Sequence, residues 1–137
     1  MQALQISMAE LRSLRATFIN EYIIPMQLPK ARALLKKHRD TGDHTLIITS
    51  TNRFIVEPIC EILGVRDFLA TELEQKGSKF TGKVKGIPAF GEGKIHHLNA
   101  WLQDHHLTLD RSSFYTDSIN DLPLMLQVDY PVAVDPD

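Results

Sequence analysis

The residues best suited to chemistry are two aspartates near the carboxyl end of the chain, Asp117 and Asp121. They lie four residues apart in a polar segment that also contains Ser118 and Asn120, and this segment follows a short apolar run. Open α/β sheets bind ligands in loops at the carboxyl ends of their strands. Carboxylate oxygens are ligands that Mg²⁺ prefers, together with water and phosphate. The spacing therefore fits a magnesium site, although an ordinary turn rich in Asp and Asn has the same composition.

A second candidate site lies where another apolar run ends. Residues 45–49 are apolar and β-branched, which is typical of a buried parallel strand. Thr49 and Ser50 end this run just before a helix that we expect at residues 53–63. Hydroxyl groups and the free N–H groups of a helix start can bind a phosphate together. The alternative is that these hydroxyls only cap the helix.

Lys94 is the third candidate, because it falls in the first turn of a helix that we expect to begin near Gly93. The helix dipole disfavours a cation at that end, so an anionic ligand would explain its position. A solvated surface lysine is the alternative.

The histidines and the cysteine form no comparable pattern. His96, His97, His105 and His106 surround the same helix, but no two of them have the i, i+4 spacing of a helical zinc site. Cys60 is the only cysteine and lies in an apolar run, which predicts a buried, inert thiol and excludes an internal disulfide.

Composition limits the class of protein. The chain has 137 residues, 43% of them hydrophobic and 23% charged, with a net charge of −2. These values predict one globular domain with a real core, and they exclude the basic face of a nucleic-acid binder. We see neither a polybasic membrane patch nor a long apolar span, so we expect no membrane partner and a cytoplasmic protein.

Helices and strands alternate along the expected fold. Ser7 and Glu10 have the spacing of a capping box, which predicts a first helix that ends before Pro25. A second helix should begin at Pro29 and end at Gly42. We then expect strands at residues 45–49, 68–74, 113–116 and 131–134, helices at 53–63, 93–102 and 121–126, and a small antiparallel excursion around 77–87. This order predicts an α/β protein with a doubly wound parallel sheet.

Three segments in this order resemble motifs of one family. They are Leu46–Thr49, Gly91–Lys94 and the acidic segment from Tyr115 to Asp121. Together they resemble the haloacid dehalogenase-like superfamily, in particular its phosphoserine-phosphatase-like branch, subfamily IB. The resemblance implies a Rossmann-like sheet that is truncated at its N-terminus here. Residues 1–42 would be the remnant of a helical cap, and residues 43–137 would be a partial core.

The resemblance also implies a role for each site residue. Asp117 would bind Mg²⁺ directly, and Asp121 would hold the metal through water or orient Lys94. Thr49 and Ser50 would bind phosphate oxygens, and Lys94 would balance the phosphate charge. The implied activity is Mg²⁺-dependent hydrolysis of a small phosphorylated metabolite, such as phosphoserine or histidinol phosphate.

One motif of that family has no counterpart in the sequence. It is D-x-D-x-[TV] after an N-terminal strand, and its first aspartate is the nucleophile, but nothing before Thr45 has this pattern. The segment from Val132 to Asp137 looks similar, but neither a threonine nor a helix follows it, so we interpret it as a terminal turn.

We therefore expect a phosphatase that is inactive or incomplete as this chain. The alternatives are a non-catalytic phosphate- and Mg²⁺-binding or interaction protein derived from a phosphatase, and a metal-independent α/β module. Loss of a central strand would expose its neighbours, which predicts marginal stability or self-association through a sheet edge.

Overall fold

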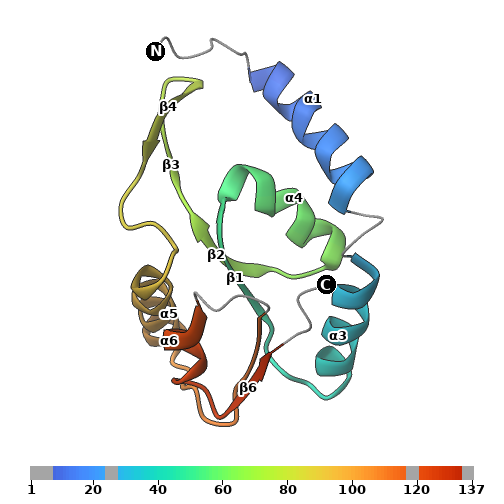
Figure 1. Cartoon of the computed structure of the whole chain (residues 1–137), viewed down its shortest axis with the longest axis vertical. Coiled ribbons are helices and arrows are strands. Elements are labelled where there is room, and N and C mark those ends of the chain that lie inside the picture. Colours follow the sequence, from blue (N-terminus) through green and yellow to red (C-terminus); the bar gives the residue numbers. More distant parts are fainter. Residues whose placement is uncertain (1–7, 24–27, 117–120, 134–137) are drawn as a thin grey trace.

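The computed structural model describes residues 8–23, 28–116 and 121–133, which form an α/β fold (Figure 1). The elements, in chain order, are α1 (Met8–Phe18), the π-helical turn η1 (Ile19–Ile23), α3 (Leu28–Asp40), β1 (Leu46–Asn52), α4 (Arg53–Leu63), β2 (Asp67–Thr71), β3 (Leu73–Lys76), β4 (Lys79–Val84), α5 (Glu92–His105), β5 (Ser113–Thr116), α6 (Leu122–Met125) and β6 (Tyr130–Ala133).

The parallel strands come in two pairs. β1 runs parallel to β2, with Leu46 opposite Asp67, and β5 runs parallel to β6, with Ser113 opposite Tyr130. Within the described residues no ladder joins β1 to β5. The predicted α/β fold with parallel strands is confirmed, and its strands form separate pairs where we expected one sheet.

The predicted antiparallel excursion is a hairpin. β3 and β4 pair antiparallel, and Gly77 in the turn between them has a φ of +64°. The single strand that we expected at residues 68–74 is divided into β2 and β3, because the chain leaves the parallel pair at Thr71 and enters the hairpin at Leu73.

Helix α4 lies at the centre of the molecule and contacts both strands of the first pair (Figure 1). Its buried face carries Val56, Cys60 and Leu63. Leu63 and Val65 form a small core with residues of α3 and β1, including Leu35 and Ile47. α5 packs against β1 and β2, and also against α6, the helix that lies between β5 and β6 in the chain.

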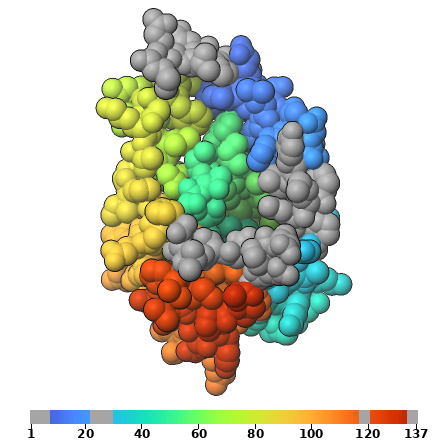
Figure 2. Space-filling view, in the orientation of Figure 1, coloured from blue at the N-terminus to red at the C-terminus, as the bar shows by residue number. Residues whose placement is uncertain are grey.

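Helix α1 lies beside α4 and contacts its first turn (Figures 1 and 2). The Arg15 guanidinium donates a hydrogen bond to the Phe54 carbonyl at 3.1 Å and stacks over the Phe54 ring at 4.3 Å. Phe54 also makes an edge-to-face contact with Phe80 of the hairpin, at 5.4 Å between ring centroids. The start of α4 is therefore held between α1 and the hairpin. The boundary that we expected between residues 1–42 and 43–137 stays a prediction.

Burial explains the state of the cysteine. Cys60 is 1% exposed, and its desolvation, reinforced by the nearby Glu57 carboxylate, raises the pKa of the thiol to about 11. The thiol is therefore protonated at neutral pH, as expected for an inert cysteine.

No helix among the described residues is long and apolar enough to cross a bilayer. The cytoplasmic location stays a prediction.

Candidate active site

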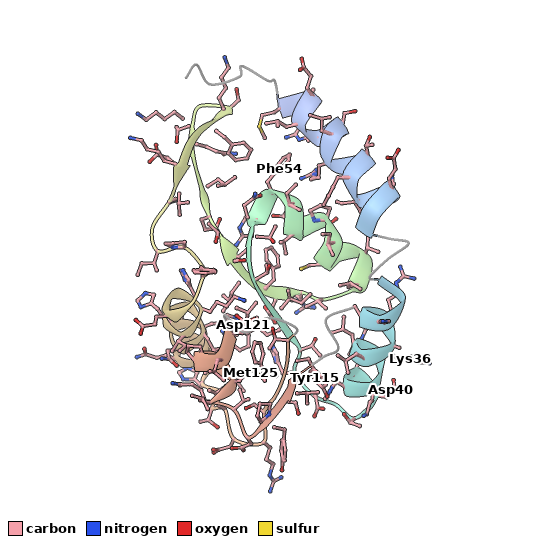
Figure 3. All side chains as sticks on the ribbon, in the orientation of Figure 1. Lys36, Asp40, Phe54, Tyr115, Asp121 and Met125 are labelled. Carbon is pink, nitrogen blue, oxygen red and sulfur yellow. The ribbon has the colours of Figure 1, made fainter. Side chains whose placement is uncertain are left out.

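The centre of the candidate site is a buried ion pair between Lys94 and Asp121. The ammonium nitrogen Nζ lies 2.7 Å from the carboxylate oxygen Oδ1, and the two side chains are 10% and 8% exposed. Lys94 is in the first turn of α5. Asp121, which is labelled in Figure 3, directly precedes α6. The structure therefore brings together two residues that are 27 positions apart. The alternative interpretation of Lys94 as a solvated surface lysine is wrong.

The second oxygen of Asp121 is also occupied. Thr116, the last residue of β5, donates a hydrogen bond from Oγ1 to Asp121 Oδ2 at 2.7 Å. Asp121 stands at the N-cap position of α6, but its side chain makes no capping bond. Because the carboxylate is held from both sides, its orientation is fixed, and with it the position of the Lys94 ammonium.

Thr49 and Ser50 lie in the second half of β1. Thr49 is half-buried, and its Oγ1 accepts a hydrogen bond from the Thr51 N–H at 3.1 Å. The cap of α4 is provided by Asn52, whose side chain accepts from the Ile55 N–H at 3.1 Å. The expectation that Thr49 or Ser50 caps this helix is therefore wrong. The hydroxyl groups of Thr49 and Ser50 precede α4 in the chain, but Asn52 is the residue that caps this helix.

Sequence reasoning missed Thr71, the last residue of β2. This threonine is 7% exposed, and its hydroxyl donates to the Ser50 carbonyl at 2.8 Å and accepts from the Ala89 N–H at 3.0 Å. It links the β1 end to the loop that leads into α5. No sequence signal distinguishes it from other strand threonines, because its partners lie 21 and 18 residues away.

The predicted metal site falls only partly on described residues. Asp117, with Ser118 and Asn120, lies outside the described residues. Within residues 8–23, 28–116 and 121–133, no group of three His, Cys, Asp or Glu side chains could hold a metal ion. Asp121 has the right chemistry for a hard cation, but both of its oxygens accept hydrogen bonds. Its contacts suit orientation of Lys94, or contact with a metal through water, better than direct ligation.

A cavity of about 420 Å³ lies between the two parallel strand pairs. Its wall includes Leu46 and Ile48 of β1 and Phe114 and Tyr115 of β5. Helices α3 and α5 lie on either side of the strands in Figure 1 and contribute further apolar side chains, namely Leu34, Leu35, Leu98, Trp101 and Leu102. The cavity therefore has strands along two sides and apolar helix faces along others, which is the environment of a buried parallel strand.

Polar contacts also line this cavity. His38 of α3 bonds Tyr115 of β5 through Nε2 at 2.8 Å and Asp43 through Nδ1 at 2.8 Å. The hydrogen bond from His38 lowers the pKa of the Asp43 carboxyl. The Ser112 hydroxyl is buried in the wall and has no hydrogen-bond partner among the described residues. Such a buried group is expected to find a partner when a polar backbone or ligand fills the space.

The fold and the buried lysine–carboxylate pair together define an α/β protein with a polar site at the ends of parallel strands, which is where such folds bind ligands. A sequence model of the haloacid dehalogenase-like hydrolases matches residues 1–126. The chain belongs to this family, and its relatives include phosphoserine phosphatases, as the sequence motifs predicted.

Two relatives illustrate the similarity. A histidinol-phosphatase of Neisseria meningitidis is 44% identical over 135 residues, which are 96% of this chain and 61% of the relative. A phosphoserine phosphatase of Mycobacterium tuberculosis is 33% identical over 96% of this chain and 42% of its own length. The chain thus spans less than two thirds of the length of these relatives.

Solved structures agree on the fold. A protein of unknown function from Bordetella pertussis Tohama I superposes with a TM-score of 0.89 at 35% identity, over 96% of this chain and 60% of that chain. A phosphoserine phosphatase in its apo form superposes with a TM-score of 0.63 at 22% identity, over 74% of this chain and 51% of that chain. At this lower identity the second likeness supports the fold alone.

The buried pair predicts strong coupling between its two members. Lys94→Met should lower the free energy of unfolding by about 3 kcal/mol, because it leaves a buried carboxylate without its cation. The double variant Lys94→Met/Asp121→Leu should lose clearly less than the sum of the two single variants, since neither charge then remains unpaired. Urea denaturation followed by circular dichroism measures all three values.

Lys83→Met is the matched control, because Lys83 is an exposed lysine of β4, and we expect a change within about 0.5 kcal/mol. Simple additivity of the two single variants would contradict the coupled pair.

Proposed function

We propose that this chain forms the phosphate- and Mg²⁺-binding half of a phosphomonoester hydrolase. The observation that carries the proposal is the Lys94–Asp121 pair, in which a buried carboxylate holds the ammonium at 2.7 Å. Phosphoryl transfer concentrates negative charge on the phosphoryl oxygens, and a prepositioned cation stabilises that charge. Lys94 would balance the phosphate charge, and Asp121 would keep Lys94 in place.

The hydroxyl side of the site would be provided by β1. Thr49 and Ser50 would bind phosphate oxygens, and N–H groups at the α4 start would add to their effect. Support comes from Asn52, which caps α4, so that neither hydroxyl is needed for that purpose. The Thr49 hydroxyl accepts from the Thr51 N–H but keeps its own hydrogen to donate to a phosphate oxygen.

Asp117 is the proposed direct ligand of the metal, on the strength of the acidic motif it shares with the family. Asp121 would contact the metal through water or act on Lys94 alone. When bound, Mg²⁺ would act as a Lewis acid that neutralises charge on the phosphoryl oxygens.

The nucleophile would come from a segment outside the printed sequence. Covalent phosphoryl transfer in this family needs a carboxylate, and the D-x-D pattern does not occur before Thr45. The cavity between β1 and β5 suits such a segment, because an extended chain there could pair with both strands and join the two parallel pairs. The greater length of the relatives supports this idea, since the chain spans 61% of the histidinol-phosphatase.

The proposed substrate class is a small phosphomonoester. The names of the relatives point to histidinol phosphate and phosphoserine as examples of this class. The alternative is a non-catalytic protein that retains phosphate binding, and the missing nucleophile favours it. The two functions differ in one requirement: the hydrolase needs an added segment that carries the nucleophile, and the binding protein does not.

The chain should bind inorganic phosphate in the presence of Mg²⁺ without hydrolysing a phosphomonoester. We expect Lys94→Met to weaken phosphate binding at least tenfold, because a charge-assisted contact is lost. Asp117→Asn should abolish the dependence of this binding on Mg²⁺. Isothermal titration calorimetry with phosphate, at several Mg²⁺ concentrations, measures both effects.

Lys83→Met and Asp104→Asn are the matched controls, since both residues are exposed and lie outside the proposed site. Equal affinity in Lys94→Met and the unchanged chain would remove the basis of the proposal. Hydrolysis by the chain alone, lost in Asp117→Asn, would mean that the nucleophile lies within the printed sequence.

The facing edges of β1 and β5 predict self-association. An unpaired strand edge is a template for pairing with another chain, so the sedimentation coefficient should rise with concentration. Leu46→Lys, which places a charge in the cavity wall, should reduce this rise. Val84→Lys, on the exposed hairpin, should leave it unchanged. A cooperative, monomeric melt at all concentrations would contradict the prediction.

A further inference from the structure

Thr71 makes two hydrogen bonds that connect distant parts of the chain. It is one of the few buried polar residues in the part of the chain that the structure describes, with 7% exposure, and lies at the end of β2. Its hydroxyl donates to the Ser50 carbonyl at 2.8 Å and accepts from the Ala89 N–H at 3.0 Å. Both partners are backbone groups, so the hydroxyl fixes main-chain positions on two sides at once.

The Ser50 side of this link lies in an irregular part of β1. Ile48 lies opposite Leu69, and the next pair of the ladder is Asn52 opposite Thr71. Between these two pairs β1 has three residues and β2 has one. Extra residues of this kind leave ladder groups unpaired and redirect side chains, often beside functional sites. The Thr71 hydroxyl binds a carbonyl inside this irregular stretch, the same stretch that carries the two candidate phosphate-binding hydroxyls.

The Ala89 side of the link leads to Lys94. Ala89 is fully buried, and the following turn is closed by hydrogen bonds from the Gly93 N–H to Phe90 and from the Lys94 N–H to Gly91. Gly93 has no room for a side chain, because a Cβ atom there would collide with the Pro88 carbonyl oxygen. The start of α5 is therefore packed tightly onto the loop that Thr71 anchors.

We propose that Thr71 is a positioning residue, which sets the distance between the Thr49–Ser50 segment and the Lys94 ammonium. One hydroxyl bridges the two segments that would bind the same phosphate, so its removal lets them shift relative to each other. This inference rests on the proposed phosphate site, but the contacts that support it are independent of the metal.

The test compares Thr71→Val with Thr71→Ser. The valine variant keeps the size of the side chain and removes both hydrogen bonds, so phosphate affinity should fall about tenfold. The serine variant keeps the hydroxyl, and its affinity should stay within about twofold of the unchanged chain. Thr81→Val is the matched control, because Thr81 also donates to a backbone carbonyl (Glu74, 3.5 Å) and accepts from a backbone N–H (Lys83, 3.3 Å), but within the hairpin.

Amide NMR spectra separate this inference from the proposed function. In Thr71→Val the signals of Ser50, Ala89 and Lys94 should shift together, and Thr71→Ser should restore them, whether or not phosphate binds. If the chain without any substitution binds no phosphate, only the proposed function is overturned. Unchanged Lys94 signals or unchanged affinity in Thr71→Val would overturn the role of Thr71, and so would an equal loss in Thr71→Ser or Thr81→Val.

Discussion

The buried ion pair of Lys94 and Asp121 is the constraint on which the rest of the site depends. Burying two charges costs desolvation energy that their attraction only partly offsets, and apolar residues could fill the same space at little loss of stability. This cost is consistent with the role in phosphate binding that we propose for the pair. The pair also requires the start of α5 and the start of α6 to stay close together, because their separation would leave both charges unpaired.

Hydrogen bonds from two neighbouring strands hold the members of this pair in position. Thr116 holds Asp121 from the end of β5, and Thr71 anchors the loop before Lys94 to the end of β1. The two strand pairs do not pair with each other within the described residues, and a cavity with apolar and polar walls lies between β1 and β5. The polar groups of the site are thus held in place on both sides of this cavity, where the additional strand proposed above would lie.

Local patterns predicted most of the elements and some of the site. The apolar run at residues 45–49 marked the first part of β1, because strand burial depends on nearby residues. The helix expected at residues 53–63 agrees with α4, which ends at Gly64 in the left-handed conformation. The order of three motifs predicted the family. The position of Lys94 in a first helical turn indicated an unusual environment, and its burial beside Asp121 provides one.

Other features could not be predicted, since they depend on contacts between distant segments. The irregular register of β1 is set by its pairing with β2, so the role of Thr71 has no local signature. Asn52 was overlooked as the helix cap because β1 extends through it, beyond the apolar run. The absence of pairing between β1 and β5 could not be predicted either, because the sequence of one strand does not show which other strand it pairs with. The role of Asp117 as a metal ligand stays a prediction.

The most direct test of the central claim is a crystal structure of this chain grown with phosphate and with Mn²⁺ in place of Mg²⁺. The anomalous signal of Mn²⁺ locates the cation without ambiguity. Our account predicts a peak at direct ligand distance from Asp117, and a phosphate in contact with both Thr49 and Lys94. A cation bound elsewhere, or a phosphate that contacts neither residue, would contradict it.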